Sequence, residues 1–295
     1  MPRDLANRLA EDRPVLLDGA TGTELERRGV RTALPLWSAS ALVDAPDVVQ
    51  RIHADYAAAG AEVLTANTFR TQRRTLARGG LGDRARELTS RAVELARSAA
   101  EQAAPGRVVF VVGSAPTLED CFEPDRVPDD DALAREHAEH ARHLAAAGVD
   151  AILVETMNTA REAVAALRAA GEAGATALVS FVCWNGARLL SGESLESAVA
   201  AVSRENPAAV LVNCLPPSNV GACWPSLRAS GLPFGAYANL GAPDDETGFS
   251  RSEDCTPDEF AAHAAAWLGV GARIVGGCCG TTPAHVRAVA HRMRR

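Results

Sequence analysis

The chain has 295 residues, of which 47 % are hydrophobic, and its 37 Asp+Glu outweigh 30 Lys+Arg to give a net charge of −7. The acidic balance argues against a nucleic acid or an anionic membrane as the main partner, and the apolar content excludes a disordered chain. Because the sequence contains no Lys, Schiff-base chemistry at a lysine is excluded as well.

The first residues predict a cytoplasmic protein. Residues 1–14 lack the apolar segment of a signal peptide, and the chain shows no apolar run long enough to span a membrane. The seven cysteines are then expected to be reduced. Reduced cysteines are read as metal ligands, nucleophiles or core residues in preference to disulfides.

Short β-branched runs alternate with amphipathic Ala/Arg/Glu-rich stretches along the chain, a pattern that predicts strands and helices in turn. The predicted strands are Val15–Leu17, Glu62–Ala66, Val108–Val112, Ala151–Val154, Leu178–Val182, Val210–Val212, Phe234–Ala238 and Arg273–Val275. The predicted helices lie near 45–59, 83–103, 131–147, 158–171, 194–204, 218–229, 256–268 and 283–294. Pro257 and Pro283 mark helix starts, and Gly60, Gly148 and Gly269 mark helix ends.

Eight strand–helix alternations predict a parallel sheet, and eight is the number of strands that closes a barrel. We therefore expect residues 1–295 to form one domain of α/β class, a single (β/α)8 barrel, a fold that typically needs about 250 residues. A doubly wound open sheet is the alternative. Its usual phosphate turn, GxGxxG, is missing after the first strand, where the sequence reads DGATGTE.

Polar residues collect where the predicted strands end, which is the edge at which parallel α/β folds hold their sites. They are Asp18, Asn67, Thr68, Ser114, Glu155, Trp184, Asn185, Asn213, Cys214, Asn239, Cys278 and Cys279. Turns and helix caps also place polar residues at such points, so position alone does not separate function from structure. The histidines of EHAEHARH at 136–143 are interpreted as part of a solvated helix face.

The cysteines are more specific than the other polar residues. Cys278 and Cys279 lie between glycines, in GGCCG, where a permissive backbone lets both sulfurs converge on one point. Cys214 ends a different strand, and closure of a barrel brings the sixth and eighth strands to the same mouth. Three thiolates favour a zinc site with one open position, as in catalytic sites, with buried thiols or a vicinal disulfide as the alternatives. The other cysteines are interpreted as structural: Cys121, Cys183, Cys223 and Cys255.

A zinc site of this kind favours alkyl transfer to sulfur. A thiol bound to zinc is deprotonated, which provides a nucleophile near neutral pH without a separate base. Three thiolates give the zinc a net negative formal charge, which suits an electron-rich thiolate better than Lewis-acid hydrolysis. The carboxylates Asp18 and Glu155 are candidates for binding an ammonium group.

Five segments resemble the zinc-dependent homocysteine S-methyltransferase family, nearly from end to end of the chain. They are LLDGATGTELERRG at 16–29, TANTFRT at 65–71, ILVETMNTAREA at 152–163, LVNCLPPSNV at 211–220 and IVGGCCGTTPAHVRAV at 274–289. The family includes S-methylmethionine- and betaine-using enzymes and the homocysteine module of cobalamin-dependent methionine synthase. The two cysteine motifs, in this order, are the most specific part of the resemblance.

The resemblance implies a (β/α)8 barrel in which Cys214, Cys278 and Cys279 hold a catalytic Zn²⁺. Homocysteine would supply the fourth ligand through its sulfur. Its thiolate would attack the methyl carbon of an activated donor in line, which yields methionine and the demethylated donor.

The resemblance also implies a place for the amino-acid end of homocysteine. Glu155 matches the carboxylate that binds the amino group, and Asp18 and Gly19 match the loop beside it. Further residues are expected at or just behind the substrate: Asn67, Thr68 and Asn213.

The methyl donor is left open by the sequence. Residues 113–130, GSAPTLEDCFEPDRVPDD, differ from the Gly- and Tyr-rich loop of the S-methylmethionine enzymes, so betaine or a methyl-corrinoid protein remain alternatives. Another small thiol or a selenol is an alternative acceptor. A non-catalytic zinc- or thiol-binding barrel and a dithiol redox protein are the alternatives from other classes, which zinc content and methyl transfer would separate.

Overall fold

The computed structural model describes residues 4–244, 248–251 and 255–294. Eight parallel strands form the central sheet in the order β1-β10-β7-β6-β5-β4-β3-β2. Their bounds are β1 (Val15–Leu16), β2 (Val63–Ala66), β3 (Phe110–Ala115), β4 (Ala151–Met157), β5 (Ala177–Val182), β6 (Ala209–Asn213), β7 (Phe234–Ala238) and β10 (Ile274–Gly277). All eight predicted strands are therefore present, with ends shifted by a few residues.

The two outer strands of this order, β1 and β2, are joined to each other. A parallel bridge links Leu17 to Val63. On either side of it, the Glu62 amide donates to the Leu16 carbonyl at 2.8 Å and the Asp18 amide donates to the Val63 carbonyl at 3.0 Å. The predicted (β/α)8 barrel is confirmed, and the open doubly wound alternative is wrong because that sheet would leave both outer strands unpaired.

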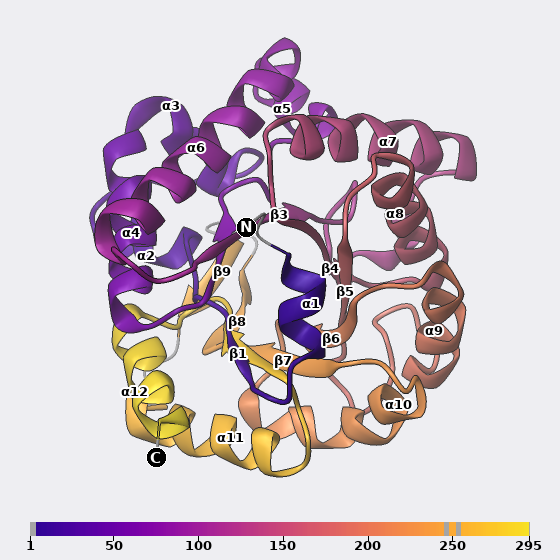
Figure 1. The fold of residues 1–295 in the computed structure, drawn as a ribbon. Helices are drawn as coiled ribbons and strands as arrows, with labels where there is room; N and C mark the ends of the chain where they lie inside the picture. Colours follow the sequence, from indigo (N-terminus) through magenta and orange to yellow (C-terminus); the bar gives the residue numbers. More distant parts are fainter. Residues whose placement is uncertain (1–3, 245–247, 252–254, 295) are drawn as a thin grey trace.

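Helices surround the barrel, as Figure 1 shows in a view along its axis. The long ones are α4 (Pro46–Ala59), α6 (Ala85–Ala103), α7 (Asp130–Ala146), α8 (Ala160–Glu172), α9 (Leu195–Val202), α11 (Pro257–Gly269) and α12 (Pro283–Met293). The short ones are α2 (Gly22–Arg27), α3 (Ala41–Asp44), α5 (Arg73–Arg78) and α10 (Trp224–Ala229). Short 3₁₀ turns are η1 (Trp37–Ser40), η2 (Gly82–Arg84), η3 (Pro124–Arg126), η4 (Ser203–Glu205) and η5 (Pro217–Cys223).

One predicted helix is divided in the structure. The segment near 218–229 begins as the 3₁₀ turn η5 and becomes α-helical only at α10, with a proline in the first turn of α10. Proline lacks the amide that a preceding α-helix would need there, so the regular helix starts at this point.

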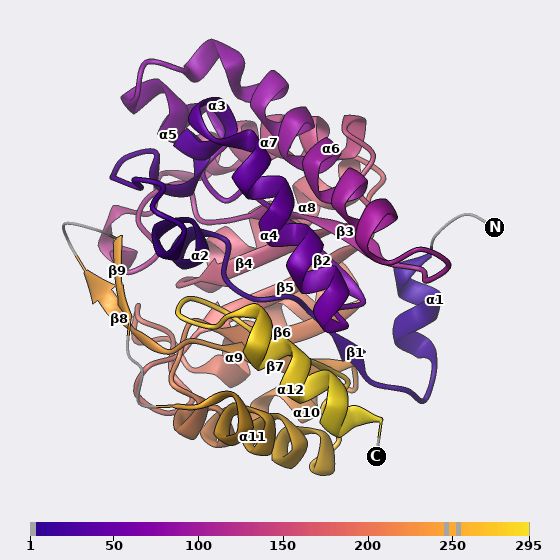
Figure 2. The ribbon, with the colours of Figure 1, turned by 90° about the vertical axis from the view of Figure 1, so that its left-hand side faces the viewer.

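Of the elements that were not predicted, which also include α2, α3 and α5, two lie at opposite ends of the barrel (Figure 2). Helix α1 (Leu5–Ala10) covers one end, where Leu5 and Leu9 join the apolar cluster inside the strands. The antiparallel hairpin of β8 (Gly241–Asp244) and β9 (Gly248–Arg251) projects at the other end. The barrel is therefore closed at one end by an apolar helix, and the site described below lies at the other end.

Side chains alternate between the inside and the outside of the barrel along each strand. The apolar cluster inside it contains Val63, Val112, Leu153, Leu178 and Leu211. Two positions further along the same strands, polar residues follow: Thr65, Ser114, Glu155, Ser180 and Asn213. The interior therefore changes from apolar to polar toward the carboxyl ends of the strands, which is the active end of such barrels.

The histidine-rich face of α7 is buried, which corrects the solvated interpretation. His140 Nε2 lies 3.1 Å from the Ser114 carbonyl oxygen, and His137 Nε2 lies 3.3 Å from Glu162 Oε1 on α8. Burial lowers the pKa of His140 to about 4, so this ring is neutral. The two histidines stand three residues apart on one helical face and pack α7 onto its neighbours.

None of the helices in the described ranges combines the length and the apolar character needed to cross a bilayer.

Candidate metal and substrate site

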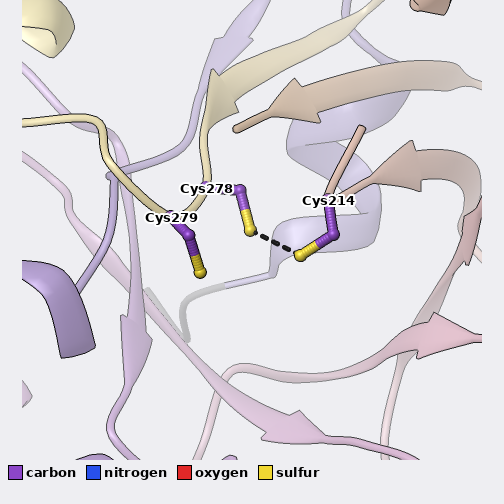
Figure 3. A group of neighbouring side chains, drawn as sticks. All are labelled: Cys214, Cys278 and Cys279. Atoms are coloured by element: carbon purple, nitrogen blue, oxygen red, sulfur yellow. Dashed lines mark hydrogen bonds between the residues drawn. The ribbon is translucent and has the colours of Figure 1, made fainter. Parts of the chain in front are cut away.

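Three cysteine thiols converge at the carboxyl ends of β6 and β10 (Figure 3). The sulfurs of Cys214 and Cys278 lie 2.9 Å apart, and with that of Cys279 they all lie within 4.8 Å of one another. A tetrahedral zinc with Zn–S bonds of about 2.3 Å places sulfurs about 3.8 Å apart. The donor set therefore fits one thiophilic metal ion, and binding it would move the Cys214 and Cys278 sulfurs apart from 2.9 Å to that separation.

The backbone around the thiols is held tightly. Cys214 has a left-handed conformation, φ 52°, which turns the chain directly after β6. The Cys278 amide donates to the Ala238 carbonyl at 2.8 Å, and the Cys279 carbonyl accepts from the Leu240 amide at 2.7 Å. A Cβ on Gly276 would lie 2.6 Å from Leu17 Cβ, so the glycine allows β10 to approach β1.

The thiols are electrostatically coupled. Hydrogen bonds from Cys214 and Cys279 hold the pKa of Cys278 well below its usual range, whereas donation to Cys278 raises that of Cys214. Three thiolates together require a cation among them.

Glu155 is the first of two buried carboxyl groups beside the thiols. Its Oε1 accepts a hydrogen bond from the Ser114 hydroxyl, and its Oε2 accepts one from the Tyr237 hydroxyl at 2.9 Å. Burial raises the pKa of Glu155 to about 7, although both hydrogen bonds lower it. A bound cation would favour the charged form.

Asp18 is the second carboxyl group, directly beyond β1. Its oxygens accept hydrogen bonds from the Thr65 amide at 2.8 Å and from the Thr65 hydroxyl at 3.1 Å. Burial raises the pKa of Asp18 to about 8, and the charge of Glu155 adds to the rise. Two neighbouring buried carboxyls, neither of which is paired with a basic side chain of the described residues, form a suitable place for a substrate ammonium group.

A bulge in β4 sets the direction of the residues around Glu155. The pairing of β4 with β5 shifts between Val154 and Met157, and Thr156 within it has a left-handed φ of 59°. Asn213 holds this bulge: its Oδ1 accepts from the Thr156 amide at 3.2 Å and its Nδ2 donates to the Thr156 hydroxyl at 2.9 Å. Asn213 thus supports the cavity wall from behind.

A cavity of about 410 Å³ connects the thiols with the carboxyl groups. The residues predicted from the sequence that line it are Asp18, Gly19, Asn67, Ser114, Glu155, Cys214, Cys278 and Cys279. A Cβ on Gly19 would lie 2.7 Å from Thr281 Oγ1, so any other residue would crowd the loop. Asn67 is fixed at the wall by a 2.8 Å hydrogen bond from its Nδ2 to the Ser38 carbonyl.

Other predicted polar residues lie away from the cavity. Thr68 is fully buried behind the wall, where its hydroxyl donates to the Ser114 carbonyl at 2.9 Å. Asn213 is likewise buried behind the wall. The residues that line the cavity do not include Trp184, Asn185 or Asn239.

Sequence reasoning missed several residues of the cavity wall. Tyr237 and Thr156 come from strands, and the others come from loops: Trp37, Phe69, Arg70, Cys121 and Phe122. The inward side of β7 could have indicated Tyr237, because it lies at the polar end of that strand. The loop residues carry no periodic signal.

The fold and the site define this protein as a (β/α)8 barrel with a cluster of three cysteines, of a kind that can hold a metal ion, beside an acidic pocket. The family model for homocysteine S-methyltransferase matches residues 15–293. A homocysteine S-methyltransferase of Escherichia coli (strain K12) is 32 % identical over 93 % of this chain and 94 % of its own. A selenocysteine Se-methyltransferase of Brassica oleracea var. italica is 28 % identical over 94 % of this chain and 88 % of its own.

A solved structure agrees with these sequences. The metallated form of the homocysteine methyltransferase MmuM from Escherichia coli superposes with a TM-score of 0.85 at 30 % identity, over 98 % of this chain and 99 % of that one. The chain therefore belongs to the homocysteine S-methyltransferase family, as the five sequence segments predicted.

Proposed function

We propose that the protein transfers a methyl group from an activated donor to the thiol of homocysteine, with Zn²⁺ held by Cys214, Cys278 and Cys279. The observation that carries the proposal is the convergence of these thiols with Asp18 and Glu155 in one cavity. When bound, the zinc ion lowers the pKa of a coordinated thiol and so provides a thiolate near neutral pH.

The residues of the chain supply binding and orientation. Asp18 and Glu155 receive the ammonium group of homocysteine, and Ser114 and Tyr237 fix the Glu155 carboxylate for that contact. With sulfur and nitrogen both held, the acceptor presents its thiolate to the open part of the cavity. The S–CH₃ bond forms as the bond between methyl and donor heteroatom breaks, and that electron pair stays with the donor.

Gly19 and Asn67 complete the acceptor site in this proposal. Gly19 leaves room for the amino-acid end of homocysteine, and Asn67 forms the adjacent wall. Thr68 and Asn213 act indirectly, through the Ser114 carbonyl and the Thr156 backbone. The whole chain, 1–295, is proposed as one homocysteine-binding barrel domain. A cytoplasmic location fits the need to keep three thiols reduced.

A donor panel tests the proposal. Zinc-loaded protein with homocysteine is offered S-methylmethionine, S-adenosylmethionine, betaine or methylcobalamin, and methionine formation is followed for each. The same protein after removal of zinc by a chelator is the control and should be inactive. Stoichiometric zinc without methionine from any donor would contradict the proposed reaction and favour a non-catalytic zinc-binding barrel. Turnover with methylcobalamin alone would indicate a methyl-corrinoid partner.

A selenol acceptor is the second candidate, because a selenocysteine Se-methyltransferase is among the relatives. Selenocysteine carries its ammonium group one methylene closer to the nucleophilic atom than homocysteine does. Comparing the two acceptors with the same donor decides between them through their kcat/KM values.

A further inference from the structure

Arg70 is a largely buried cation that has no close counter-ion among the residues the structure describes. It follows β2 in the turn before α5 and lines the cavity. Its side chain is only 13 % exposed, and its guanidinium stands over the ring of Phe69 at 5.7 Å from the centroid. Nε is buried and has no hydrogen-bond partner in the described part of the chain, and the ion-pair contact from Nη2 to Asp120 Oδ2 is long, at 3.9 Å.

The other two arginines of the cavity wall are already neutralised. Arg78 Nη2 lies 2.6 Å from Glu119 Oε2, and Arg126 Nη1 lies 2.6 Å from Glu123 Oε2. Burial of a charge without a hydrogen-bonded counter-ion is unfavourable, and a fixed guanidinium is well suited to bind a planar anion with two parallel hydrogen bonds. Arg70 thus has the properties of a receptor for an anion from outside the chain.

The charges of the cavity indicate where that anion belongs. Asp18, Glu155 and the three thiols make the inner wall acidic, so a substrate carboxylate is repelled there. Arg70 lies instead in a loop beyond a strand end, among the aromatic side chains of Trp37, Phe69 and Phe122. Aromatic faces attract methylated cations. This part of the cavity therefore combines a place for a carboxylate with one for an onium group.

We propose that the Arg70 guanidinium binds the carboxylate of the methyl donor, and so restricts donors to zwitterions that carry a methylated sulfonium or quaternary ammonium group. The inference rests on the proposed function, since the acceptor is taken to occupy the thiols and the acidic wall. Donors without a carboxylate would leave the buried guanidinium unpaired and would bind weakly.

Equilibrium binding tests the proposal without turnover. Isothermal titration calorimetry of the zinc-loaded protein compares betaine with betaine methyl ester, and S-methylmethionine with its methyl ester. At least one acid should bind about 10- to 100-fold more tightly than its ester, as expected for a hydrogen-bonded charge pair. Arg70→Gln should abolish this preference and leave the Kd of homocysteine unchanged. Arg70→Lys keeps the charge but loses the paired donors. Its preference for the acid over the ester should lie between that of the wild type and that of Arg70→Gln.

Arg126→Gln is the matched control, because it removes one positive charge from the same cavity wall at a residue already paired with Glu123. It should keep the preference for the acid. The proposal is wrong if the wild type prefers neither acid over its ester, or if Arg126→Gln has the same effect as Arg70→Gln. It is also wrong if Arg70→Gln weakens the binding of homocysteine and leaves the preference for the acid unchanged. Binding of a zwitterion through Arg70 without methionine formation would overturn the proposed function and leave this inference standing.

Discussion

Tyr237 and Glu155 are joined across the mouth of the barrel by a hydrogen bond of 2.9 Å from the tyrosine hydroxyl to Oε2. Their strands, β7 and β4, are separated in the sheet by β6 and β5. The bond fixes the direction of the carboxylate and lowers its pKa against the effect of burial. It therefore favours the charged form of Glu155 that an ammonium group requires.

The variant Tyr237→Phe should raise the KM for homocysteine about tenfold, because a hydrogen bond to a charged group contributes about 1.5–3 kcal/mol. The kcat should change less, since the hydroxyl holds the ammonium site and not the reacting sulfur. Steady-state kinetics over a pH series measures both. The acidic limb of the profile should also move to higher pH, and a KM effect without that shift would contradict a role through Glu155.

The proposed metal site predicts that replacing different cysteines will have different effects on the zinc content of the protein. Cys279→Ser should lose zinc during purification, since it removes one of three thiolate ligands, whereas Cys255→Ser should keep stoichiometric zinc because its thiol lies outside the cluster. Elemental analysis after dialysis measures the content, and competition with a chelator measures the affinity. Full zinc occupancy in Cys279→Ser would show that the metal is bound elsewhere.

Acceptor binding should weaken as the pH falls. Burial raises the pKa of Asp18 to about 8 and that of Glu155 to about 7, so both carboxyls become neutral below these values and lose their attraction for an ammonium group. Binding to both carboxylates then requires release of one proton between pH 8 and 7 and of two below pH 7, so the Kd should rise by up to about tenfold per pH unit in the first range and up to about a hundredfold in the second. Methionine is the suitable probe because it has no thiol proton to lose.

Calorimetry of methionine binding in buffers of different ionisation enthalpy measures the proton release directly. Glu155→Gln should weaken binding at pH 8 and flatten its dependence on pH. An unchanged slope in this variant would assign the titration to Asp18 instead.

The strand–helix order and the metal ligands could be predicted from the sequence because both depend on local pattern. Runs such as Val210–Val212 indicate a buried strand by composition, and the residue after a parallel strand lies at the active end of a barrel. That rule alone placed Cys214 and Cys278 at the same mouth, as the structure does.

The features that escaped prediction depend on contacts between distant parts of the chain. Nothing in the local sequence distinguishes Tyr237 from other tyrosines in strands. Its role comes from the hydrogen bond to Glu155, which is 82 residues away in the chain. His140 lies in a segment rich in charged residues, yet its side chain is buried. The Ser114 carbonyl, on a neighbouring strand, accepts a hydrogen bond from the buried ring. The left-handed turn at Thr156 is likewise set by Asn213, on another strand.

Asn213 provides a test of how far the bulge in β4 depends on one side chain. Its Oδ1 accepts from the Ser180 hydroxyl at 2.6 Å in addition to the Thr156 amide, and all three residues are buried. Replacement by alanine would leave these donors without a partner and would release the left-handed conformation of Thr156.

We expect Asn213→Ala to lower the free energy of unfolding by about 2–4 kcal/mol, since buried unpaired donors each cost about 1–3 kcal/mol. Urea denaturation at matched zinc content measures the loss. The KM for homocysteine should rise as well, because Glu155 adjoins the released Thr156. Ser180→Ala is the comparison: it removes the Ser180 hydroxyl from both Asn213 and Tyr237 but keeps the two Asn213–Thr156 hydrogen bonds, so the loss of stability should be smaller, about 1–2 kcal/mol. An equal loss of stability in the two variants would mean that the bulge is held by the strands themselves and not by Asn213.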